Sequence, residues 1–316
     1  MKDAFGREIN YLRLSVTELC NLRCRYCMPE EGVCKLRHED LLTEEEMLMA
    51  VRAAAGLGIT KVRVTGGEPL TKPNILSICR GVAHTSGIRE TALTTNAFRL
   101  PELAKPLREA GVSRVNISLD TLNAEKYAYM TRRGRLEDAL RGIDAALNAG
   151  FAQVKINVVL IGGFNDDEVP ALAALTKQWP VDVRFIELMP MPGNQSFGPD
   201  SYLPVASVLD ALPEAAPEME DGVARLYRLP GALGRIGLIS PISQHFCGSC
   251  NRIRLTADGK LKPCLHSAEE YGIKGLDEAG MAAQMRRAIL AKPQCHGALD
   301  AENRSRAARG MSQIGG

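Results

Sequence analysis

The sequence is poor in features that mark several common protein classes. Aromatic residues make up only 5% of the 316 residues, and there is a single tryptophan. The 39 basic and 37 acidic side chains leave a net charge of only +2. Nothing in that balance draws the chain toward nucleic acid or an acidic membrane surface. A zinc-stabilised nucleic-acid-binding protein should show a basic stripe with interleaved aromatics, so this composition disfavours that class.

Long apolar runs are also missing. No run approaches the ~18 residues of a membrane-spanning helix. The first seven residues lack the apolar core of a secretory signal. We therefore expect a cytoplasmic protein, in which the nine cysteines are thiols or metal ligands rather than disulfides. With 45% hydrophobic residues, the chain can form one large α/β domain or two domains.

Three cysteines lie close together after the first predicted strand. Cys20, Cys24 and Cys27 have the spacing C-x3-C-x2-C and follow an apolar–polar alternation at 12–17. Thiolates favour soft metals and are the usual ligands of iron–sulfur clusters. Three ligands would leave one iron of a four-iron cluster open for a substrate or cosubstrate. The alternatives are a zinc site, which usually takes four ligands, a redox thiol group, or unrelated cysteines.

A second set of three cysteines follows much later in the chain. Its members have the spacing C-x2-C-x13-C: Cys247, Cys250 and Cys264. A predicted hairpin turn at 258–259 folds the last of them back toward the others. The spacing resembles most of a zinc ribbon, which His245 or His266 could complete. A second iron–sulfur cluster is the other interpretation, and two sets that each lack one ligand favour it.

The remaining candidate ligands show no such order. Cys34, Cys79 and Cys295 have no metal-binding spacing, and their simplest interpretation is as small apolar residues. The five histidines form no pair at catalytic spacing along the chain. We assign a role to none of these residues.

Strand and helix patterns alternate from residue 11 to about 190. Predicted strands cover 11–17, 59–65, 90–95, 113–119, 153–160 and 181–188, and predicted helices lie near 43–57, 73–86, 101–110, 135–149 and 167–179. Six β–α repeats predict a parallel sheet with right-handed crossovers. Beyond them, 204–211 is a possible short helix and 223–229 a possible strand.

The predicted strands have one polar face. In the second strand Lys61 and Arg63 alternate with Val62 and Val64, although parallel sheets are normally apolar on both faces. We therefore expect an α/β fold, a six-stranded partial (β/α)6 TIM-like barrel with a wet, cationic lumen. An exposed antiparallel sheet is the alternative. Residues 1–230 would form the barrel, and 231–316 a C-terminal extension with the second cysteine set.

Three shorter features add to this picture. The pair Gly66-Gly67 closes the second strand, where glycines allow backbone to approach a ligand and leave their N–H groups available as donors. Arg252 and Arg254 face the same way on a strand and suit an anion or a guanine edge. The chain ends in two glycines, 315–316, which lack side chains and can enter a narrow cavity.

The first cysteine set, with Tyr26 before its last cysteine, resembles the signature of radical S-adenosylmethionine (SAM) enzymes. Nearly end to end, the chain is similar to the GTP 3′,8-cyclase family, whose members catalyse the first step of molybdenum cofactor biosynthesis. The resemblance rests on both cysteine sets, residues 12–17, Gly66-Gly67-Glu68-Pro69, Leu93-Thr94-Thr95-Asn96, Asn116-Ile117-Ser118-Leu119-Asp120, Arg184-Phe185-Ile186-Glu187, Asn251-Arg252-Ile253-Arg254 and Gly315-Gly316.

The resemblance implies cofactors and contacts. It implies one 4Fe–4S cluster on each cysteine set, with SAM bound at the first. The implied SAM contacts are Tyr26, Gly67, Glu68, Ser118 and Met189. The implied GTP contacts are Arg13, Arg63, Thr94, Lys155, Arg252, Ile253 and Arg254, while Lys61 and Arg184 lie on the right strands without assigned partners. Catalytic roles are implied for Arg252, Arg254, Gly315 and Gly316.

The resemblance also implies the reaction and its partners. In such a lyase a deoxyadenosyl radical removes hydrogen from ribose C3′ of GTP, and C3′ then bonds to guanine C8, giving 3′,8-cyclo-7,8-dihydro-GTP. A flavodoxin or ferredoxin would supply electrons, and a cyclic pyranopterin monophosphate synthase would take the product. We expect a monomer or homodimer and no nucleic acid or membrane partner. The rival within the superfamily is an enzyme with an auxiliary cluster that acts on a peptide or tRNA.

Overall fold

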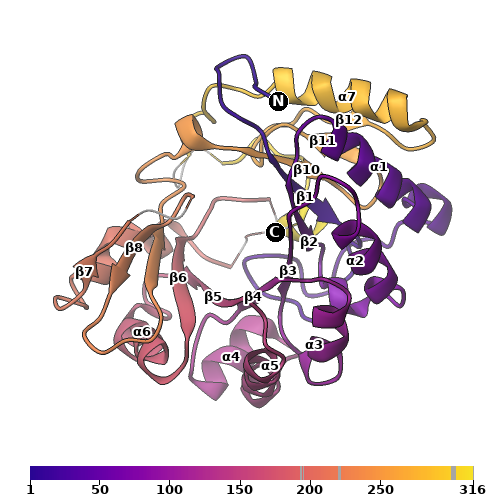
Figure 1. Ribbon diagram of the computed structural model, residues 1–316. Coiled ribbons are helices and arrows are strands. Elements are labelled where there is room, and N and C mark those ends of the chain that lie inside the picture. Colours follow the sequence, from indigo (N-terminus) through magenta and orange to yellow (C-terminus); the bar gives the residue numbers. More distant parts are fainter. Residues whose placement is uncertain (193, 195, 220–221, 300–303, 316) are drawn as a thin grey trace.

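The computed structural model describes residues 1–192, 194, 196–219, 222–299 and 304–315. Within them, a single sheet has the strand order β12-β11-β10-β1-β2-β3-β4-β5-β6-β9-β8-β7. The sheet curves around a central space, most helices lie outside the curve, and the C-terminal end lies inside it (Figure 1). The chain therefore forms a barrel-like shell around an interior that its own terminus enters.

The middle of the sheet is a run of β–α units. Its parallel strands are β1 (Tyr11–Ser15), β2 (Lys61–Thr65), β3 (Glu90–Thr95), β4 (Arg114–Ser118), β5 (Gln153–Leu160) and β6 (Val181–Glu187). The helices between them are α1 (Glu44–Gly56), α2 (Ile75–Ala83), α3 (Leu100–Glu109), α4 (Ala124–Thr131), α5 (Leu136–Asn148) and α6 (Val169–Gln178). The predicted α/β order and parallel sheet are confirmed, and an antiparallel sheet in this region is wrong.

Residues after β6 extend both edges of the sheet. β10 (Arg252–Leu255) pairs in parallel with β1, and β9 (Ile236–Ile239) pairs in parallel with β6. Antiparallel strands complete the edges: β11 (Lys260–Lys262) and β12 (Tyr271–Gly272) beyond β10, and β8 (Arg225–Arg228) and β7 (Ala216–Pro217) beyond β9. The predicted hairpin at 258–259 is confirmed. A continuous sheet crosses residue 230, and the division into two domains there stays a prediction.

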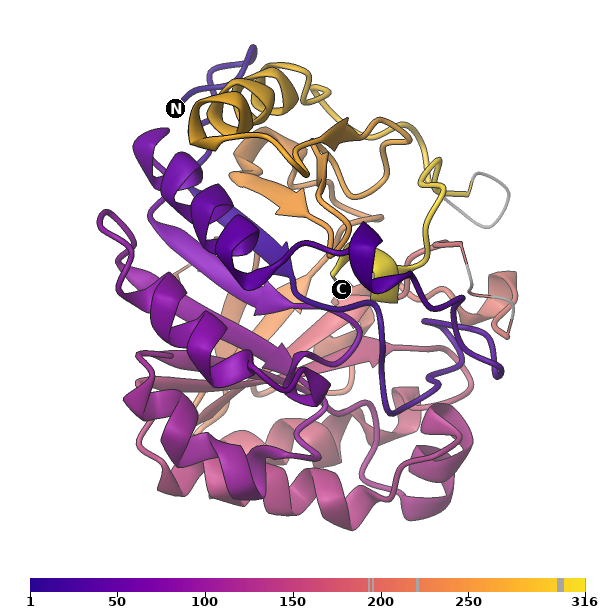
Figure 2. The same cartoon turned by 90° about the vertical axis from the view of Figure 1, so that its right-hand side faces the viewer.

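The remaining helices are short or lie outside the repeats. They are α7 (Glu278–Leu290), α8 (Met311–Ile314) and the 3-10 turns η1 (His38–Asp40), η2 (Pro69–Thr71), η3 (Asp166–Glu168), η4 (Pro199–Ser201), η5 (Val205–Leu209) and η6 (Cys247–Ser249). In Figure 2 the short helix α8 lies near the carboxyl ends of β1 and β2. No helix in the described part of the chain combines the length and apolarity needed to cross a bilayer.

Local sequence explains where these elements begin and which face they bury. Thr43 begins α1 with a reciprocal capping box, because its hydroxyl accepts from the Glu46 N–H at 3.2 Å and the Glu46 carboxylate accepts from its N–H at 2.9 Å. On the strands, Leu12, Val62 and Ile117 are fully buried in the main apolar core. Their polar neighbours face the interior, which confirms the two-faced strands. Helix α4 escaped prediction because it has only two turns; Asn123 caps its start.

Two glycines in helices should respond to alanine with opposite signs. A Cβ at Gly142 of α5 would overlap the carbonyl oxygen of Ala97, whereas a Cβ at Gly56, the last residue of α1, meets nothing within 4 Å. Gly142→Ala should therefore lower the free energy of unfolding by about 1–3 kcal/mol. Gly56→Ala should raise it by ~0.5–1 kcal/mol through helix propensity and a less flexible unfolded chain. Urea unfolding of both variants checks this; equal shifts would contradict the packing argument.

Candidate functional site

A cavity of about 390 Å³ opens on the inner face of the sheet. All six cysteines of the two predicted sets line it, together with side chains from β1 through β6 and β10. The pairing of β10 with β1 brings the two sets to one cavity although more than two hundred residues separate them. The fold therefore joins into one site the features that the sequence shows separately.

The first cysteine set lies in a tight loop after β1. The N–H groups of Cys27 and Met28 both donate to the Cys24 carbonyl, at 2.9 and 3.1 Å. Burial raises the pKa of Cys20 to about 11 and of Cys27 to about 12, and it holds the pKa of Cys24 well above its usual value. Buried thiols of this kind stay neutral unless a cation stabilises the thiolate, and bound metal does so directly.

The second cysteine set has a cation at its side. Lys292 lies 3.8 Å from the Cys250 sulfur and donates to the carbonyl oxygens of Arg252 and Pro263, both at 2.7 Å. Burial alone would raise the pKa of Cys250, but Lys292 and Arg252 lower it overall. Burial raises the pKa of Cys264. Lys292 carries no signal in the sequence, because α7 and the following loop reach this set only through tertiary packing.

Three histidines that are far apart in the sequence meet beside this set. The His296 ring lies 4.5 Å from that of His245 and 4.9 Å from that of His266. The histidines form no pair at catalytic spacing along the chain, yet these three meet in space. The His266 Nδ1 lies 3.0 Å from the Ser305 hydroxyl, and burial lowers the pKa of His266 to about 3, so its ring is neutral.

The thiol arrangement fits clusters better than single ions. Among the described residues, no three His, Cys, Asp or Glu side chains converge on a point where one metal ion could bind. A zinc ribbon needs such convergence, so His245 and His266 do not complete one here. In a four-iron cluster each thiolate binds a different iron, so its ligands stand apart around the cluster. Each set supplies three half-buried thiols on a cavity wall, which suits that larger group.

The glycine pair after β2 serves packing. A Cβ at Gly67 would overlap the Leu19 carbonyl oxygen, and the Gly67 N–H donates to the Thr17 carbonyl at 2.7 Å. The expectation that this N–H is available to a ligand is wrong, because the cysteine loop lies directly on the glycine. The neighbouring Glu68 carboxylate is oriented by the Thr95 hydroxyl at 2.8 Å and the Asn96 N–H at 2.7 Å. Burial raises its pKa to about 7.

The other residues predicted to contact SAM surround this loop. Tyr26, Gly67, Glu68, Ser118 and Met189 all line the cavity. The Tyr26 hydroxyl donates to the Asp120 carboxylate at 2.9 Å, which fixes the tyrosine ring. Burial raises the pKa of Asp120 to about 6. In the sequence, Asp120 stands out only as the last residue of the family motif 116–120. The structure shows that its carboxylate orients Tyr26.

Basic side chains dominate the rest of the cavity wall. Among described residues, eight lysine or arginine side chains line it, against two carboxylates, those of Glu68 and Asp120. Arg13 on β1 lies in register with Arg63 on β2 and with Arg254 on β10. Burial and these two neighbours lower the pKa of Arg13 well below its usual range. Burial, with nearby arginines, lowers the pKa of Arg63 and of Arg254 to about 10.

This row of arginines concentrates positive charge on one part of the cavity wall. Arg252 and the unassigned pair Lys61 and Arg184 lie on the same cavity wall. Such a concentration of positive charge, away from bulk water, is suited to a ligand with several negative charges, such as a polyphosphate.

Two predicted contacts lie off the cavity wall. Lys155 on β5 is fully buried, with its Nζ 3.7 Å from the Asp182 carboxylate. The Ile253 side chain belongs to the apolar core, so only its backbone can face a ligand. Ile253 lies between Arg252 and Arg254 on one strand, so its side chain points to the other face of the sheet. The sequence alternation alone therefore predicts that this side chain lies in the core.

The C-terminal tail enters the cavity. Met311 and Ser312 line it, and Arg254 Nη1 donates to the Gly315 carbonyl at 2.5 Å. Gly315 has φ +74°, and a Cβ there would overlap the Thr65 hydroxyl. Glycine is therefore required at 315 by both backbone conformation and space. Gly316 lies outside the described residues.

One further polar residue on the cavity wall has no assigned role. Asn116 on β4 is 1% exposed, and among the described residues neither its amide nitrogen nor its amide oxygen has a hydrogen-bond partner. In register it lies between Thr94 and Lys155, and the Thr94 hydroxyl also lacks a partner. Buried polar groups without partners are rare in folded proteins and point to a missing ligand or water.

Comparison with known families covers both halves of the chain. Residues 14–176 match the model of the Radical SAM superfamily, and residues 181–297 match the model described as Molybdenum Cofactor Synthesis C. The chain is 49% identical to the GTP 3′,8-cyclase of Alkaliphilus oremlandii and 47% identical to that of Moorella thermoacetica, with 100% of each chain covered. It is 42% identical to the Listeria monocytogenes enzyme of the same name, with 100% and 99% covered.

Solved structures share the fold at low identity. Streptococcus suis SuiB aligns with a TM-score of 0.65 at 14% identity, over 91% of this chain and 67% of that one. Methylornithine synthase PylB aligns with a TM-score of 0.51 at 16% identity, over 96% and 80%. These likenesses support the architecture of the sheet and its helices.

Metal content tests the two thiol sets directly. Anaerobic reconstitution with iron and sulfide should load about eight irons per chain, as two four-iron clusters. Cys250→Ala should lower this to about four, because it removes one of only three ligands of the second set. Cys34→Ala is the control and should leave the iron content unchanged, since Cys34 is exposed and lies outside both sets. Wild-type protein that is folded but saturates near four irons would contradict the second cluster.

Proposed function

The chain belongs to the GTP 3′,8-cyclase family of radical SAM enzymes, and from this premise we propose how its cavity performs the cyclisation of GTP. The reaction joins ribose C3′ to guanine C8 and begins molybdenum cofactor biosynthesis. The observation that carries the proposal is the row of Arg254, Arg13 and Arg63, which are adjacent in register on three neighbouring strands and line the cavity. We assign this row to the triphosphate of GTP.

The charge balance of the cavity supports that assignment. Arg254 and Arg63 both lower the pKa of Arg13, so the three guanidinium groups lie close enough to repel one another. A triphosphate brings several negative charges, and guanidinium groups bind phosphate oxygens in bidentate fashion. Thr94 and Arg252 line the same cavity, which supports their predicted GTP contacts, while the contact of the buried Lys155 stays a prediction.

The remaining residues of the cavity suit the cofactors. Each cysteine set would hold one 4Fe–4S cluster, and SAM would bind between Tyr26, Gly67, Glu68, Ser118 and Met189. The oriented carboxylate of Glu68 is suited to accept hydrogen bonds from the amino group of SAM. When bound, the clusters and SAM supply one-electron chemistry that amino-acid side chains cannot provide.

The part of the protein itself is to position the substrate and exclude water. The cationic row would fix the phosphate end of GTP, and this leaves the ribose to be aimed at the reacting carbon. Arg252 and Arg254 lie on β10, the strand that directly follows Cys247 and Cys250 of the second cysteine set. We propose a catalytic role for both arginines. Gly315, held by Arg254, is proposed to complete the wall of the reaction space, and the catalytic role of Gly316 stays a prediction.

The peptide or tRNA alternative finds no support in this site. SuiB has been solved bound to the precursor peptide SuiA, but its 14% identity to this chain shows a shared fold alone. The donor of electrons, the synthase that takes the product, the oligomeric state and the cytoplasmic location stay predictions. Each concerns surfaces or conditions outside the cavity.

Product analysis tests the function and the division of labour between the thiol sets. Reconstituted protein with SAM, a reductant and GTP should form 3′,8-cyclo-7,8-dihydro-GTP. Cys24→Ala should abolish SAM cleavage, because the cluster that binds SAM cannot form. Cys250→Ala should keep some SAM cleavage and lose the cyclised product. Intact product formation by both variants would show that neither cysteine is an essential ligand.

The unsatisfied amide of Asn116 is best explained by a ribose hydroxyl. The amide offers one acceptor and two donors. A phosphate at neutral pH offers only acceptors and would leave the amide oxygen unpaired. A hydroxyl can donate to that oxygen and accept from the amide nitrogen or from the neighbouring Thr94 hydroxyl. We therefore propose that Asn116 contacts the sugar of GTP, beside the residues that hold its phosphates.

Nucleotide analogues test the role of Asn116. Asn116→Ala should weaken GTP binding by roughly 2–10-fold, the usual value of one neutral hydrogen bond. The loss should vanish with either 2′-deoxy-GTP or 3′-deoxy-GTP, whichever lacks the bound hydroxyl. Arg63→Ala, as the comparison, should weaken all three nucleotides alike because it removes a phosphate contact. An equal loss for all three nucleotides in Asn116→Ala would refute the sugar contact. Calorimetric titration measures each dissociation constant.

A further inference from the structure

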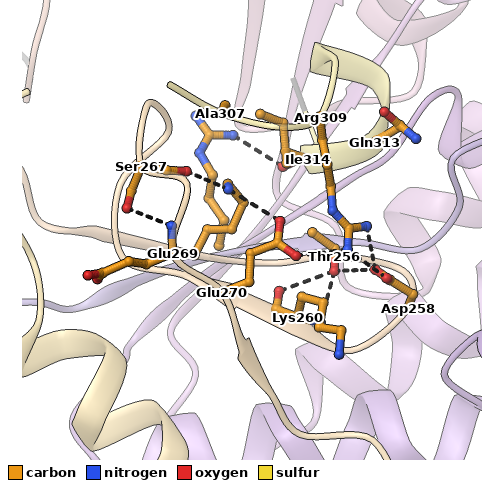
Figure 3. A network of polar contacts seen from close by, with 12 residues as sticks. Thr256, Asp258, Lys260, Ser267, Glu269, Glu270, Ala307, Arg309, Gln313 and Ile314 are labelled. Carbon is orange, nitrogen blue, oxygen red and sulfur yellow. Dashed lines mark hydrogen bonds and ion pairs between the residues drawn. The ribbon is translucent and has the colours of Figure 1, made fainter. Parts of the chain in front are cut away.

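The tail, defined here as residues 304–315, is fixed by an ion-pair clamp outside the cavity. Arg309 Nη1 and Nη2 donate to the two carboxylate oxygens of Asp258, both at 2.9 Å, and Nη2 also donates to Glu270 at 2.8 Å (Figure 3). The three side chains are 21%, 14% and 19% exposed. We propose that Arg309 is a positioning residue, which sets how far the tail reaches into the cavity.

The two carboxylates of the clamp are themselves held in place. Asp258 lies in the turn between β10 and β11, where the Thr256 hydroxyl donates to it at 2.5 Å. Glu270 pairs with the fully buried Lys262 at 3.3 Å, and Lys262 also donates to the Ser267 carbonyl at 2.8 Å (Figure 3). β10 is joined to the centre of the sheet through β1. The anchor therefore belongs to the rigid part of the fold.

The same hairpin holds the tail at a second point. Arg254 on β10 donates to the Gly315 carbonyl, and Asp258 in the following turn holds Arg309. Between Arg309 and Gly315 the tail forms the single turn α8. The N–H of Gly310 donates to the Gln313 side chain at 3.1 Å, and the Gln313 N–H returns to the Gly310 carbonyl at 3.1 Å. With both ends attached and its middle closed on itself, the segment has little slack.

The contacts inside the cavity depend on this register. The backbone N–H of Ser312 hydrogen-bonds to the Cys27 thiol, a ligand of the first set. Gly315 lies where any Cβ would overlap the Thr65 hydroxyl. A shift by one residue would bring the Ile314 side chain to the place that only glycine fits. A device that fixes the register is therefore needed, and the bidentate geometry of Arg309 provides it.

The matched control lies three residues before the clamp. Arg306 carries the same charge on the same segment, and its side chain is exposed. Arg306→Ala therefore changes the net charge of the tail as Arg309→Ala does, without touching Asp258 or Glu270. Arg309→Lys keeps the charge but replaces the planar fork by a single ammonium, which cannot hold both oxygens of Asp258 in the same geometry.

The test compares these variants in the cluster-loaded, full-length protein at equal iron content. Hydrogen exchange at the Ser312 and Gly315 amides reads the tail directly and needs no turnover. In Arg309→Ala both amides should exchange roughly tenfold faster or more, as expected when charge-assisted hydrogen bonds are lost. The cyclisation kcat should fall at least about tenfold, with SAM cleavage retained. Arg309→Lys should be intermediate, and Arg306→Ala should match the wild type.

The functional part of this inference rests on the proposed cyclisation, and the two can fail separately. If wild-type protein cleaves SAM but makes no cyclised product, the proposed function is wrong. The hydrogen-exchange data still test whether Arg309 positions the tail. Unchanged tail exchange in Arg309→Ala, or faster exchange with unchanged kcat, overturns the positioning role. If Arg309→Ala loses iron, the comparison is made with Arg309→Lys at wild-type iron content instead. Unchanged hydrogen exchange in the tail and an unchanged cyclisation kcat in that variant would overturn the proposal.

Discussion

The concentration of like charges on one face of a parallel sheet is the constraint on which this molecule depends. Arg254, Arg13 and Arg63 lie side by side on β10, β1 and β2 and each has a lowered pKa. Folding can tolerate such a row only because the opposite face of the same strands is fully apolar and is covered by helices. The alternation that places Leu12 and Leu14 in the core is thus also what directs Arg13 into the cavity.

The pairing of β10 with β1 connects this constraint to the metal sites. Each cysteine set is adjacent to one of these two strands, so the thiols reach the same cavity. The hairpin that continues from β10 then carries Asp258, which holds the tail through Arg309. One strand pair therefore determines the position of both thiol sets, of the arginine row and of the segment that ends in the cavity.

Several polar groups in the interior lie where ligands are proposed. The pKa values of the three thiols of the first set are raised by burial, and the Asn116 amide has no partner in the described part of the chain. In an ordinary core such groups would be replaced by apolar ones at little cost. Their concentration around one cavity is consistent with a site whose stability and order come in part from the cofactors and substrate that it binds.

The sequence by itself determined the β–α order, the polar face of the strands and the two incomplete cysteine sets, because periodicity and spacing are local properties of a chain. It could not determine that Lys292 lies beside Cys250, that three histidines meet, or that Leu19 occupies the space above Gly67. Those contacts join residues from different segments. Only the tertiary structure decided them, since the packing of distant elements sets which side chains share a volume and which buried groups find partners.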